Sequence, residues 1–554
     1  EGGKVIDSSL VKPASSEAKS KVIDDFARDK LMQLDLTEAG IDSVEEIPGF
    51  YGFGKEGYRP TTFYYNGVAL GQSRWPNDNP GAAYLWTDKV DDYSGNIQTT
   101  PFSFTYKSGT NADGTPQHDL DRTKLWDLDG KKDLYIGGYI GSFYSDTVQG
   151  IANLDVENKK LTSTTGSCYK PLADHRFYFF NLIEEIDLPG ESYLDRDSNI
   201  LYFYPFDDNT ADASIEVSTL DSFMFEFNKT QYVTLKGITM STMRNKAIKA
   251  TNVENMVFDD LEISHGSSNA IELNGNNNQV INSHIYDMGS GGITVTGGDR
   301  KTLEGGRNLI ENNRIHSVNR VYYGYQPAVW AYGVGQQILH NDLYDGPHML
   351  VRFQNGSNDH RLEYNEIYNA VDNSSDMGAV YWGRNPTELG IEINYNYFHD
   401  MGNPYGGHGQ QSVFWDDGAY GPHMKGNIFY RGTLTADQSN DIGRSYAVKT
   451  NGGQYSVLEN NIFIDAPAVA YFQPWAADGL PVQNRWWLWA LDASYQSYSN
   501  VTSLFDAVDY ESEIWHEHYE GTQWDKLWTH FNDETRALVA PYAHGSDLKA
   551  YTDA

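Results

Sequence analysis

Short hydrophobic segments alternate with polar turns along the second half of the chain. Each copy has a hydrophobic residue, several polar residues that include asparagine, a second hydrophobic residue and a turn. Copies lie at residues 280–287, 309–316, 338–345, 362–369, 393–400, 424–430 and 458–465. In six of them an asparagine stands two places before the second hydrophobic residue, at intervals of 24 to 34 residues. Repeats of this length are typical of solenoid proteins.

These segments are too short and too rich in β-branched and aromatic residues for helices, and Gly and Asn separate them. The pattern predicts strands stacked in successive coils, about 4.8 Å apart, with the hydrophobic residues inside. We expect the repeated asparagines in the tight turns, where left-handed backbone and side-chain hydrogen bonds suit them. An ordinary β-sandwich would not keep one asparagine phrase over six copies. The predicted fold is therefore all-β, a right-handed parallel β-helix.

The segments that flank the repeats differ from them in composition. Residues 1–48 are rich in Ala, Lys, Glu and Asp and are expected to be helical or irregular. Residues 49–245 carry strand-like runs, which we interpret as the first strands of the β-helix plus an inserted β-rich lobe. The core of coils is expected at 246–466. Residues 467–554 are rich in Trp, and their hydrophobic spacing predicts a partly helical cap on the coils, favoured over a carbohydrate-binding appendage.

Stacked coils allow the strands to be compared side by side, because successive side chains of a strand point to opposite faces. One strand per coil is aligned at 329–333, 350–354, 380–384, 413–417 and 447–451. The second position is hydrophobic in this alignment and is expected to face the core. The third and fifth positions then share the outer face, where they place Arg352, Trp382, Trp415, Lys449, Arg384 and Asp417.

Aromatic and charged residues gathered on one outer face favour a saccharide-binding cleft. Flat rings cover the apolar face of a sugar, and charged groups bind its hydroxyls or transfer protons. An ordinary polar face with aromatic ladders is the alternative. By the same alternation Asp416 is expected to point to the interior or a turn, where a carboxylate must be paired or hydrogen-bonded. It is therefore a scaffold residue or an acid with a raised pKa.

Composition and charge exclude several classes of partner. The 554 residues include 41 Lys and Arg against 76 Asp and Glu, and the net charge of −35 would repel nucleic acid or an anionic membrane surface. No hydrophobic run approaches the ~18 residues of a membrane span, so no membrane insertion is expected. The single cysteine, Cys168, excludes an internal disulfide and a Cys-based zinc site. The pattern leaves the oligomeric state open.

The chain begins Glu1-Gly2-Gly3 without Met, as if a leader had been removed. We therefore expect a secreted, periplasmic or cell-surface protein.

Several motifs resemble bacterial right-handed β-helix glycoside hydrolases, and most closely glycoside hydrolase family 141, in which α-L-fucosidase and xylanase activities are known. They are residues 375–381, Gly383-Arg384, residues 395–400 and Trp415-Asp416-Asp417-Gly418. Upstream segments at 63–67, 73–77, 133–139, 180–187 and 194–196 are similar too, so the resemblance covers roughly residues 60–465. It implies a hydrolase of complex glycans, and it implies that Asp376 and Asp417 are the catalytic carboxylates.

Glycosidic hydrolysis normally needs one protonated carboxyl group and one ionised one. A cation lowers the pKa of a neighbouring carboxylate, so we expect Asp417, beside Arg384, to be the base or nucleophile. Asp376 is then the acid by elimination, with Asp416 and Asp400 as further candidates. His399 and His423 are candidates for binding a sugar hydroxyl or tuning an aspartate, although turn histidines are more often structural. No metal or other cofactor is expected for this reaction.

Two other functions remain open. A polysaccharide lyase would cleave a uronic-acid polymer by β-elimination, with Arg352, Arg384 and Lys449 as base and carboxylate-neutralising groups. The two aspartates would then need another role, such as holding Ca²⁺. A non-catalytic glycan-binding protein is the third possibility. In each case the expected partner is an oligosaccharide or polysaccharide, and its sugar is not specified by the sequence beyond the fucose or xylan that the resemblance implies.

Overall fold

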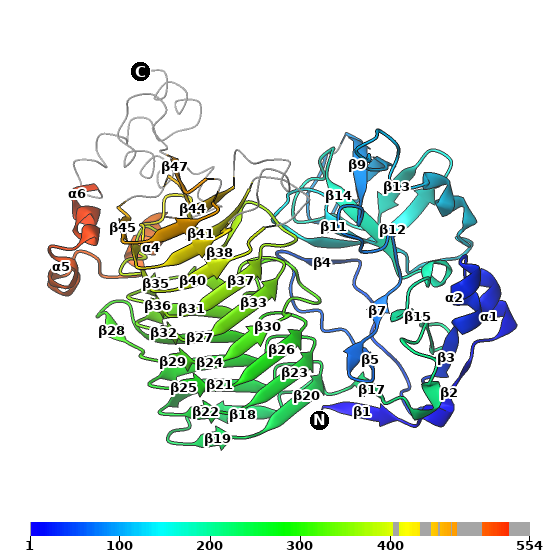
Figure 1. The fold of residues 1–554 in the computed structure, drawn as a ribbon, viewed down its shortest axis with the longest axis horizontal. Helices are drawn as coiled ribbons and strands as arrows, with labels where there is room; N and C mark the ends of the chain where they lie inside the picture. Colours follow the sequence, from blue (N-terminus) through cyan, green and yellow to red (C-terminus); the bar gives the residue numbers. More distant parts are fainter. Residues whose placement is uncertain are drawn as a thin grey trace.

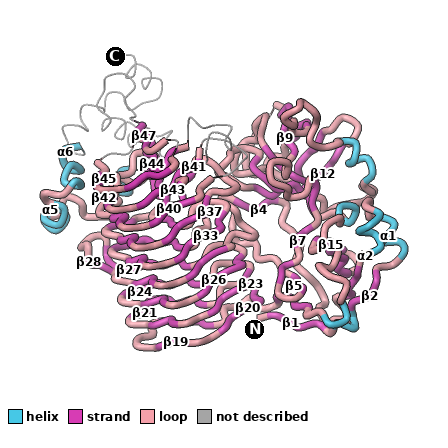
Figure 2. Tube along the Cα trace, viewed as in Figure 1, coloured by secondary structure: helices cyan, strands magenta, loops and turns pink. Residues whose placement is uncertain are grey.

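The computed structural model describes residues 2–92, 94–402, 409–432, 445–452, 455–466, 468–473 and 501–530. A tall stack of coils stands beside a β-rich lobe (Figure 1). Strands and loops make up most of both parts, and the short helices lie at the edges of the molecule (Figure 2). The lobe comes first in the chain, and the coils follow it.

The coils consist of three sheets whose strands pair in parallel from coil to coil. The first sheet contains β18 (Phe225–Asn228), β21 (Ile248–Glu254), β24 (Ile271–Asn276), β27 (Ile293–Asp299), β31 (Val329–Val334), β34 (Val351–Arg352), β38 (Met377–Gly383), β41 (Gln410–Asp416), β44 (Tyr446–Asn451) and β47 (Ala470–Gln473). Two short strands join its edge, the antiparallel β28 (Glu304–Gly305) and the parallel β35 (Ser357–Asn358).

The second and third sheets have nine strands each. The second contains β19 (Thr234–Lys236), β22 (Val257–Asp259), β25 (Gln279–Ile281), β29 (Leu309–Glu311), β32 (Gln337–Leu339), β36 (Arg361–Glu363), β39 (Glu392–Asn394), β42 (His423–Lys425) and β45 (Val457–Glu459). The third contains β20 (Thr239–Met243), β23 (Glu262–Gly266), β26 (His284–Met288), β30 (Arg314–His316), β33 (Asp342–Gly346), β37 (Glu366–Ala370), β40 (Tyr397–His399), β43 (Ile428–Tyr430) and β46 (Ile462–Ile464).

This arrangement confirms the predicted parallel β-helix. Its limits differ from the expected 246–466, because the coils begin at β18 and continue to β47. Both of these strands lie outside the repeated asparagine phrase, which was the only signal that the sequence offered for a coil.

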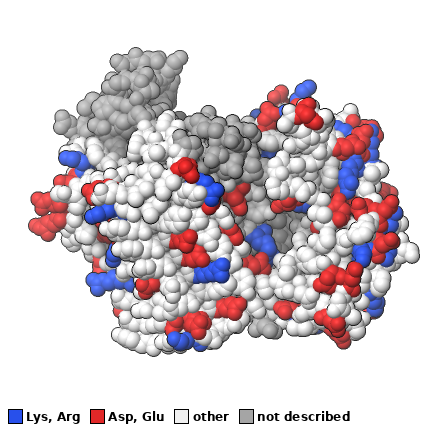
Figure 3. All heavy atoms as spheres, in the orientation of Figure 1, with Lys and Arg blue, Asp and Glu red and all other residues white. Residues whose placement is uncertain are grey.

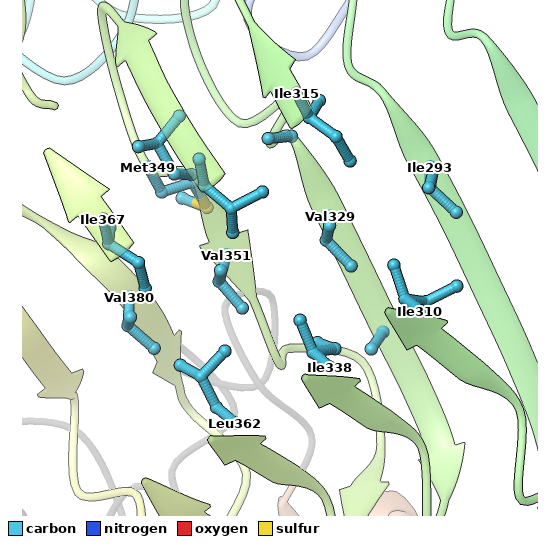
Figure 4. Close-up of a cluster of buried hydrophobic side chains, with 14 of the residues drawn as sticks. Ile293, Ile310, Ile315, Val329, Ile338, Met349, Val351, Leu362, Ile367 and Val380 are labelled. Atoms are coloured by element: carbon cyan, nitrogen blue, oxygen red, sulfur yellow. The ribbon is translucent and has the colours of Figure 1, made fainter. Parts of the chain in front are cut away.

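Branched aliphatic side chains from all three sheets fill the interior of the coils. In Figure 4, Val329, Val351 and Val380 of the first sheet point toward Ile338 and Leu362 of the second, and all five are buried. Fully burying such a side chain stabilises the fold by roughly 1.5–3 kcal/mol. The packed interior gives the outer face a fixed backbone from which the polar side chains project.

The repeated asparagines form a ladder inside the coils. Each Nδ2 donates to the Oδ1 of the next asparagine at 2.9 to 3.0 Å, through Asn313, Asn341, Asn365, Asn396, Asn427 and Asn461. Each of these Oδ1 atoms also accepts a backbone N–H from the neighbouring coil. The left-handed residue is the one before the asparagine, with φ of 55° at His340 and 59° at Tyr364. The expectation of left-handed asparagines was therefore wrong: the position requires the amide, which satisfies buried backbone groups.

The lobe contains three largely antiparallel sheets. One sheet contains β1 (Gly3–Ile6), β17 (Ile215–Ser218), β5 (Phe63–Tyr65) and β6 (Val68–Ala69). The largest contains β11 (Tyr135–Tyr139), β12 (Thr147–Asp155), β13 (Lys160–Ser163), β10 (Ser103–Lys107), β9 (Leu85–Val90), β14 (Arg176–Phe180), β8 (Arg74–Trp75) and β4 (Phe50–Gly52). The remaining sheet contains β2 (Val11–Pro13), β3 (Met32–Asp35), β16 (Ile200–Phe203), β15 (Glu191–Asp195) and β7 (Gly71–Gln72). Two short helices, α1 (Ser16–Lys21) and α2 (Asp25–Lys30), lie at its edge.

Residues 1–48 belong to this lobe, which corrects the expectation of a helical or irregular segment. They contribute β1, β2 and β3, as well as α1 and α2. The strand β3 pairs with β16, and Leu34 of β3 is buried with Leu201 and Phe203 of β16. The hydrophobic residues of this short strand are too few to be distinguished from those of a loop in the sequence.

The lobe holds one loop of the coils, residues 317–328, in place. Arg320 donates to Thr62 Oγ1 at 3.1 Å and to Tyr64 Oη at 3.0 Å, both in the lobe. The buried carboxylate of Asp146 accepts the backbone N–H groups of Tyr323 at 3.1 Å and Gly324 at 3.0 Å. This loop therefore has a fixed path along the first sheet.

The described part of the C-terminal flank contacts the coils through tryptophans. It includes α4 (Val501–Asp506), α5 (Glu513–Tyr519) and α6 (Leu527–His530). Trp515 Nε1 donates to the Arg300 carbonyl at 2.9 Å, and Trp524 Nε1 donates to the Gly421 carbonyl at 3.0 Å. Much of 467–554 lies outside the described residues. In the portion that is described, no helix has both the length and the apolar character needed to cross a bilayer.

Candidate active site

The register of the first sheet decides which side chains reach its outer face. Val329, Val351, Val380, Val413 and Val448 stand opposite one another in successive strands and are fully buried. The next residue of each strand points outward. This outer column is Trp330, Arg352, Tyr381, Phe414 and Lys449.

Trp382 and Trp415 are not on this face, which corrects their prediction as sugar-stacking residues. Both are fully buried in the coil interior, with ring centroids 6.0 Å apart. In the sequence alignment, the strands at 350–354 and 447–451 were shifted by one residue relative to the others. In the remaining strands, the alignment assigned outward-facing positions to the interior. A slip of one residue exchanges the two faces of a strand. Because aromatic residues occupy both faces here, hydrophobicity alone did not reveal the error.

Three aspartates converge at the outer face around β38 and β41. Asp376 and Asp417 have left-handed backbones, with φ of 61° and 46°, so each turns out of the regular strand alternation. Gly378 allows β38 to lie close to β41, since a Cβ there would lie 2.8 Å from the Phe414 backbone nitrogen. Lys449 lies level with Phe414 in the next strand. Lys449 Nζ lies 3.5 Å from Asp376 Oδ1 and 4.6 Å from the centroid of the Phe414 ring.

Asp416 lies on the outer face with Phe414, which corrects the expectation that it points inward. Tyr381 Oη donates to its Oδ2 at 3.1 Å, and the backbone N–H of Asp417 donates to its Oδ1 at 2.8 Å. Burial and then the charges of Asp417 and Asp376 raise the pKa of Asp416 well above its ordinary value. The surroundings of Asp416 therefore favour its neutral, protonated form.

Asp417 is paired with Arg384 as expected, but its pKa is raised, whereas the sequence predicted a lowered pKa. Arg384 Nε donates to Asp417 Oδ2 at 2.7 Å, and Asn451 Nδ2 donates to Oδ1 at 3.3 Å. Burial, together with the charge of Asp376, raises the pKa of Asp417 despite the opposing effect of Arg384. The expectation of a lowered pKa was wrong because the sequence shows the cation but not the burial.

Arg352 lies one strand before Tyr381 in the same outer column. Its guanidinium donates to the Tyr325 carbonyl at 3.1 Å and to Gln354 Oε1 at 2.9 Å. The guanidinium carbon lies 4.2 Å from the centroid of the Trp330 ring and 5.3 Å from that of Tyr325. Arg352, Arg384 and Lys449 are thus gathered at one face, as the sequence predicted.

The lobe adds an aromatic wall that the sequence did not connect to this face. Phe53 of the lobe lies 4.9 Å from Tyr325 between ring centroids, and Tyr325 lies 6.1 Å from Tyr381. The backbone N–H of Ser375 also donates to the Phe143 carbonyl of the lobe at 3.1 Å. Tyr381 was missed as a functional residue, although the run of one valine per strand would have placed it beside Arg352.

His399 and His423 lie on other sheets, and in the described part of the chain neither contacts the three aspartates. His399 of β40 in the third sheet binds Asp400 at 2.8 Å and Glu366 at 3.1 Å. His423 of β42 in the second sheet lies between Glu392 and Glu459, at 3.7 and 3.6 Å. The prediction that these two histidines act at the site is therefore corrected, because both lie outside it. Each belongs to a sheet whose outer face points elsewhere, and the linear sequence does not show this.

A cavity of about 350 Å³ lies between the lobe and the coils, but it contains none of the predicted site residues. Its basic residues are held within the protein, for example Arg320, which donates to Asp287 at 2.8 Å. Figure 3 shows acidic groups spread over this side of the molecule and groups of both signs bordering the hollow between the two parts. Within the described ranges, no group of three or more His, Cys, Asp or Glu side chains has the arrangement of a metal site.

Comparisons with known proteins agree with the fold. A model of the right handed beta helix region matches residues 223–326, which confirms the predicted hand. A solved structure described as a glycoside hydrolase is similar over 90% of this chain and 85% of that chain, with a TM-score of 0.54 and 13% identity. No curated protein sequence matches the chain.

Two further solved structures are more distantly similar. The complex of XylC with xylose is 12% identical over 83% of this chain and 74% of that chain, with a TM-score of 0.40. An alginate lyase from Paenibacillus sp. is 15% identical over 41% of this chain and 74% of that chain, with a TM-score of 0.30. The assignment of function depends on the site itself.

Proposed function

We propose that this protein is a glycoside hydrolase whose reaction takes place at Asp376, Asp416 and Asp417. The observation that carries the proposal is the convergence of these carboxyl groups on one outer face, with Asp416 holding a raised pKa. Glycosidic hydrolysis needs a proton donor and an ionised carboxylate on the two sides of the scissile bond. This face supplies both, beside an aromatic wall that is suited to a sugar ring.

The environments of the three carboxyl groups assign them different roles. Asp416 is the general acid, because burial and two neighbouring carboxylates favour its neutral form. Asp376 is the base or nucleophile, because Lys449 supports its charge and its side chain is 33% exposed. Asp417 is 16% exposed and both its oxygens have partners, so it positions Asp416 and keeps its pKa high. The sequence predicted Asp417 as the base or nucleophile because of a lowered pKa, and Asp376 as the acid. The raised pKa of Asp417 removes that reason, and we assign the base or nucleophile to Asp376 instead.

Leaving-group dependence tests these roles. Asp416→Asn should lose most activity on natural glycans and on aryl glycosides with poor leaving groups. It should retain far more on aryl glycosides with good leaving groups, which need no protonation. Asp376→Asn should lose activity on both kinds of substrate. Equal losses for the two variants on every substrate would contradict the assignment of the acid.

The family resemblance guides the choice of the sugar. We propose α-L-fucosyl linkages as the first substrates to test and xylan as the second. Fucosyl and xylosyl aryl glycosides, together with plant and mucin glycans, form the screening set. Release of the free sugar, measured by chromatography, would support the proposal.

A polysaccharide lyase is the second candidate, and one observation favours it. Tyr381 Oη and Lys449 Nζ are both beside the aspartates, and β-elimination uses a tyrosine or lysine base. The three carboxylates have no equivalent role in that reaction. Products with the ultraviolet absorbance of an unsaturated sugar would overturn the hydrolase proposal. Glycan binding with no turnover in the wild-type protein would favour a binding protein.

A further inference from the structure

Arg352 differs from the other two basic residues of the candidate site. Arg384 pairs with Asp417 at 2.7 Å, and Lys449 lies 3.5 Å from Asp376. Arg352 has no carboxylate partner among the residues that the structure describes. Two of the five N–H donors of its guanidinium are bound, by the Tyr325 carbonyl and Gln354 Oε1. Its Nε is buried with no hydrogen-bond partner in the described part of the chain.

An unpaired cation in this position is unfavourable for the protein alone. The guanidinium packs against the rings of Trp330 and Tyr325, and the residue is partly buried. Burial lowers the pKa of Arg352, since the charged form loses its hydration. A buried charge normally has a paired partner. The rings offset part of this cost through cation–π attraction, but they leave the Nε donor unsatisfied.

Glu388 is an acidic residue that influences Arg352 electrostatically, but it does not neutralise it. Glu388 is fully buried, and its Oε1 accepts the backbone N–H of Gly356 at 2.6 Å. Burial raises the pKa of Glu388 to about 8, so the group is largely neutral at pH 7. Glu56 also influences Arg352 electrostatically, but it forms no ion pair with it in the described part of the chain. Arg352 therefore has no carboxylate in direct contact within the described ranges.

The charges of the site leave room for one further negative group. The pairs Arg384–Asp417 and Lys449–Asp376 each sum to zero, and Asp416 is neutral while it holds its proton. Arg352 is the one of the three basic residues with no contacting carboxylate in the described part of the chain. A negatively charged substituent therefore meets an unpaired cation here, although the whole chain carries a net charge of −35.

We infer that Arg352 binds an anionic substituent, a carboxylate or a sulfate ester, on the sugar next to the bond that is cleaved. Arg352 stands opposite Tyr381 in the neighbouring strand, and Tyr381 donates to Asp416. Neighbouring strands are about 4.8 Å apart, and Asp416 lies on the second strand from that of Arg352, so a glycan bound at the proposed acid passes close to the guanidinium. A planar fork of N–H donors suits a carboxylate or sulfate. The inference rests on the proposed function, and it makes the substrate an acidic glycan.

Binding of matched monosaccharides tests this inference without turnover. Glucuronic acid is compared with glucose, galacturonic acid with galactose, and galactose 6-sulfate with galactose, by ligand-detected NMR. We expect at least one anionic sugar to bind about tenfold more tightly than its neutral counterpart, the usual effect of a charged hydrogen bond. A preference for the uronates identifies a carboxylate, and a preference for the sulfated sugar identifies a sulfate ester. If no anionic sugar binds better than its counterpart, the inference is wrong.

Two variants assign the preference to Arg352. Arg352→Gln should abolish it, and Arg352→Lys should retain part of it, because lysine keeps the charge but not the fork. Arg314→Gln is the matched control, since Arg314 lies on the third sheet beside Asp342. Thermal unfolding shows whether each variant folds. If Arg352→Gln does not fold, the comparison of the wild type with Arg352→Lys tests the role of Arg352. A preference that persists in Arg352→Gln would overturn the inference.

The products separate this inference from the proposed function. Unsaturated products from an acidic glycan would end the hydrolase proposal and leave the role of Arg352 intact. Hydrolysis of neutral glycans with no preference for anionic sugars would support the hydrolase proposal and overturn the role of Arg352.

Discussion

The outer faces of the first and third sheets of the coils carry the same kinds of residue but organise them differently. On the third sheet, Tyr286, His316, Tyr344, Tyr368 and His399 stack in sequence, with ring planes within 9° and centroids 4.4 to 5.6 Å apart. On the first sheet, the rings of Tyr381 and Phe414 meet edge to face at 72°. The rings of this third-sheet ladder cover one another, and those of Tyr381 and Phe414 do not.

The charged groups show the same contrast. On the third sheet, Arg314 lies beside Asp342 at 3.6 Å and His399 contacts Glu366 at 3.1 Å, so unlike groups alternate along the ladder. On the first sheet, burial and the charges of Asp417 and Asp376 raise the pKa of Asp416, and burial and Asp376 raise that of Asp417. Arg352 has no ion pair with an acidic residue in the described part of the chain. Perturbed, convergent charges are typical of functional sites, and paired charges beside stacked rings are typical of a structural face.

Replacing one aspartate on each face gives the largest expected difference. Asp376→Asn on the first sheet should lower kcat about 10²–10⁴-fold, the usual contribution of a catalytic acid or base. Asp342→Asn on the third sheet should leave kcat within about twofold. Initial rates on a cleaved glycan measure both variants. Similar losses in the two would mean that the first sheet is not the catalytic face.

Aromatic residues inside and outside the coils should differ in their effect on stability. Trp415→Ala removes a fully buried ring and should lower the free energy of unfolding by about 3–5 kcal/mol. Tyr368→Ala, in the stacked outer ladder, should lower it by about 1 kcal/mol. Urea unfolding of both variants checks the difference. If Trp415→Ala lost only substrate affinity at unchanged stability, the ring would be a sugar platform after all.

The hydroxyl of Tyr381 should tune the acid. Its hydrogen bond to Asp416 at 3.1 Å favours the ionised carboxylate, so its removal raises the pKa of Asp416 further. Tyr381→Phe should therefore shift the alkaline limb of the pH–rate profile to higher pH and lower kcat by about tenfold. Tyr368→Phe on the third sheet is the control. An unchanged alkaline limb would separate Tyr381 from the acid.

The smallest expected effect is a pH-dependent gain in stability. The folded-state pKa of Asp416 is raised above its unfolded value, so its contribution is present at low pH and is lost as pH rises through the folded pKa. Asp416→Asn removes this loss. The variant should be less sensitive to rising pH than the wild type, and at neutral pH and above it should be at least as stable. Melting temperatures across pH measure this, and parallel curves would mean that Asp416 is ionised in the folded protein.

The sequence predicted the coils more completely than the site. A six-fold asparagine phrase is a strong signal because each copy binds the next, and every member of the ladder was identified. The prediction that Arg352, Arg384, Lys449 and the aspartates share a region also held, since stacking brings equivalent positions of successive coils together.

The faces of individual residues were harder to predict. Trp382 and Asp416 were exchanged between interior and surface because aromatic residues occupy both faces of these strands, so hydrophobicity did not fix their register. The left-handed backbone of Asp417 also left no pattern in the sequence. The direction of the Asp417 pKa shift depends on burial by segments distant in sequence. The wall that Phe53 forms depends on the docking of the lobe.

Cleavage in oxygen-18 water tests the central claim most directly, namely that the three aspartates of the first sheet hydrolyse a glycosidic bond. Mass spectrometry of the products from a cleaved glycan locates the oxygen of the attacking water. The account predicts one labelled oxygen at each new reducing end with the wild-type protein, and very little product with Asp376→Asn. Unlabelled products that have lost the mass of one water would show elimination and contradict the account.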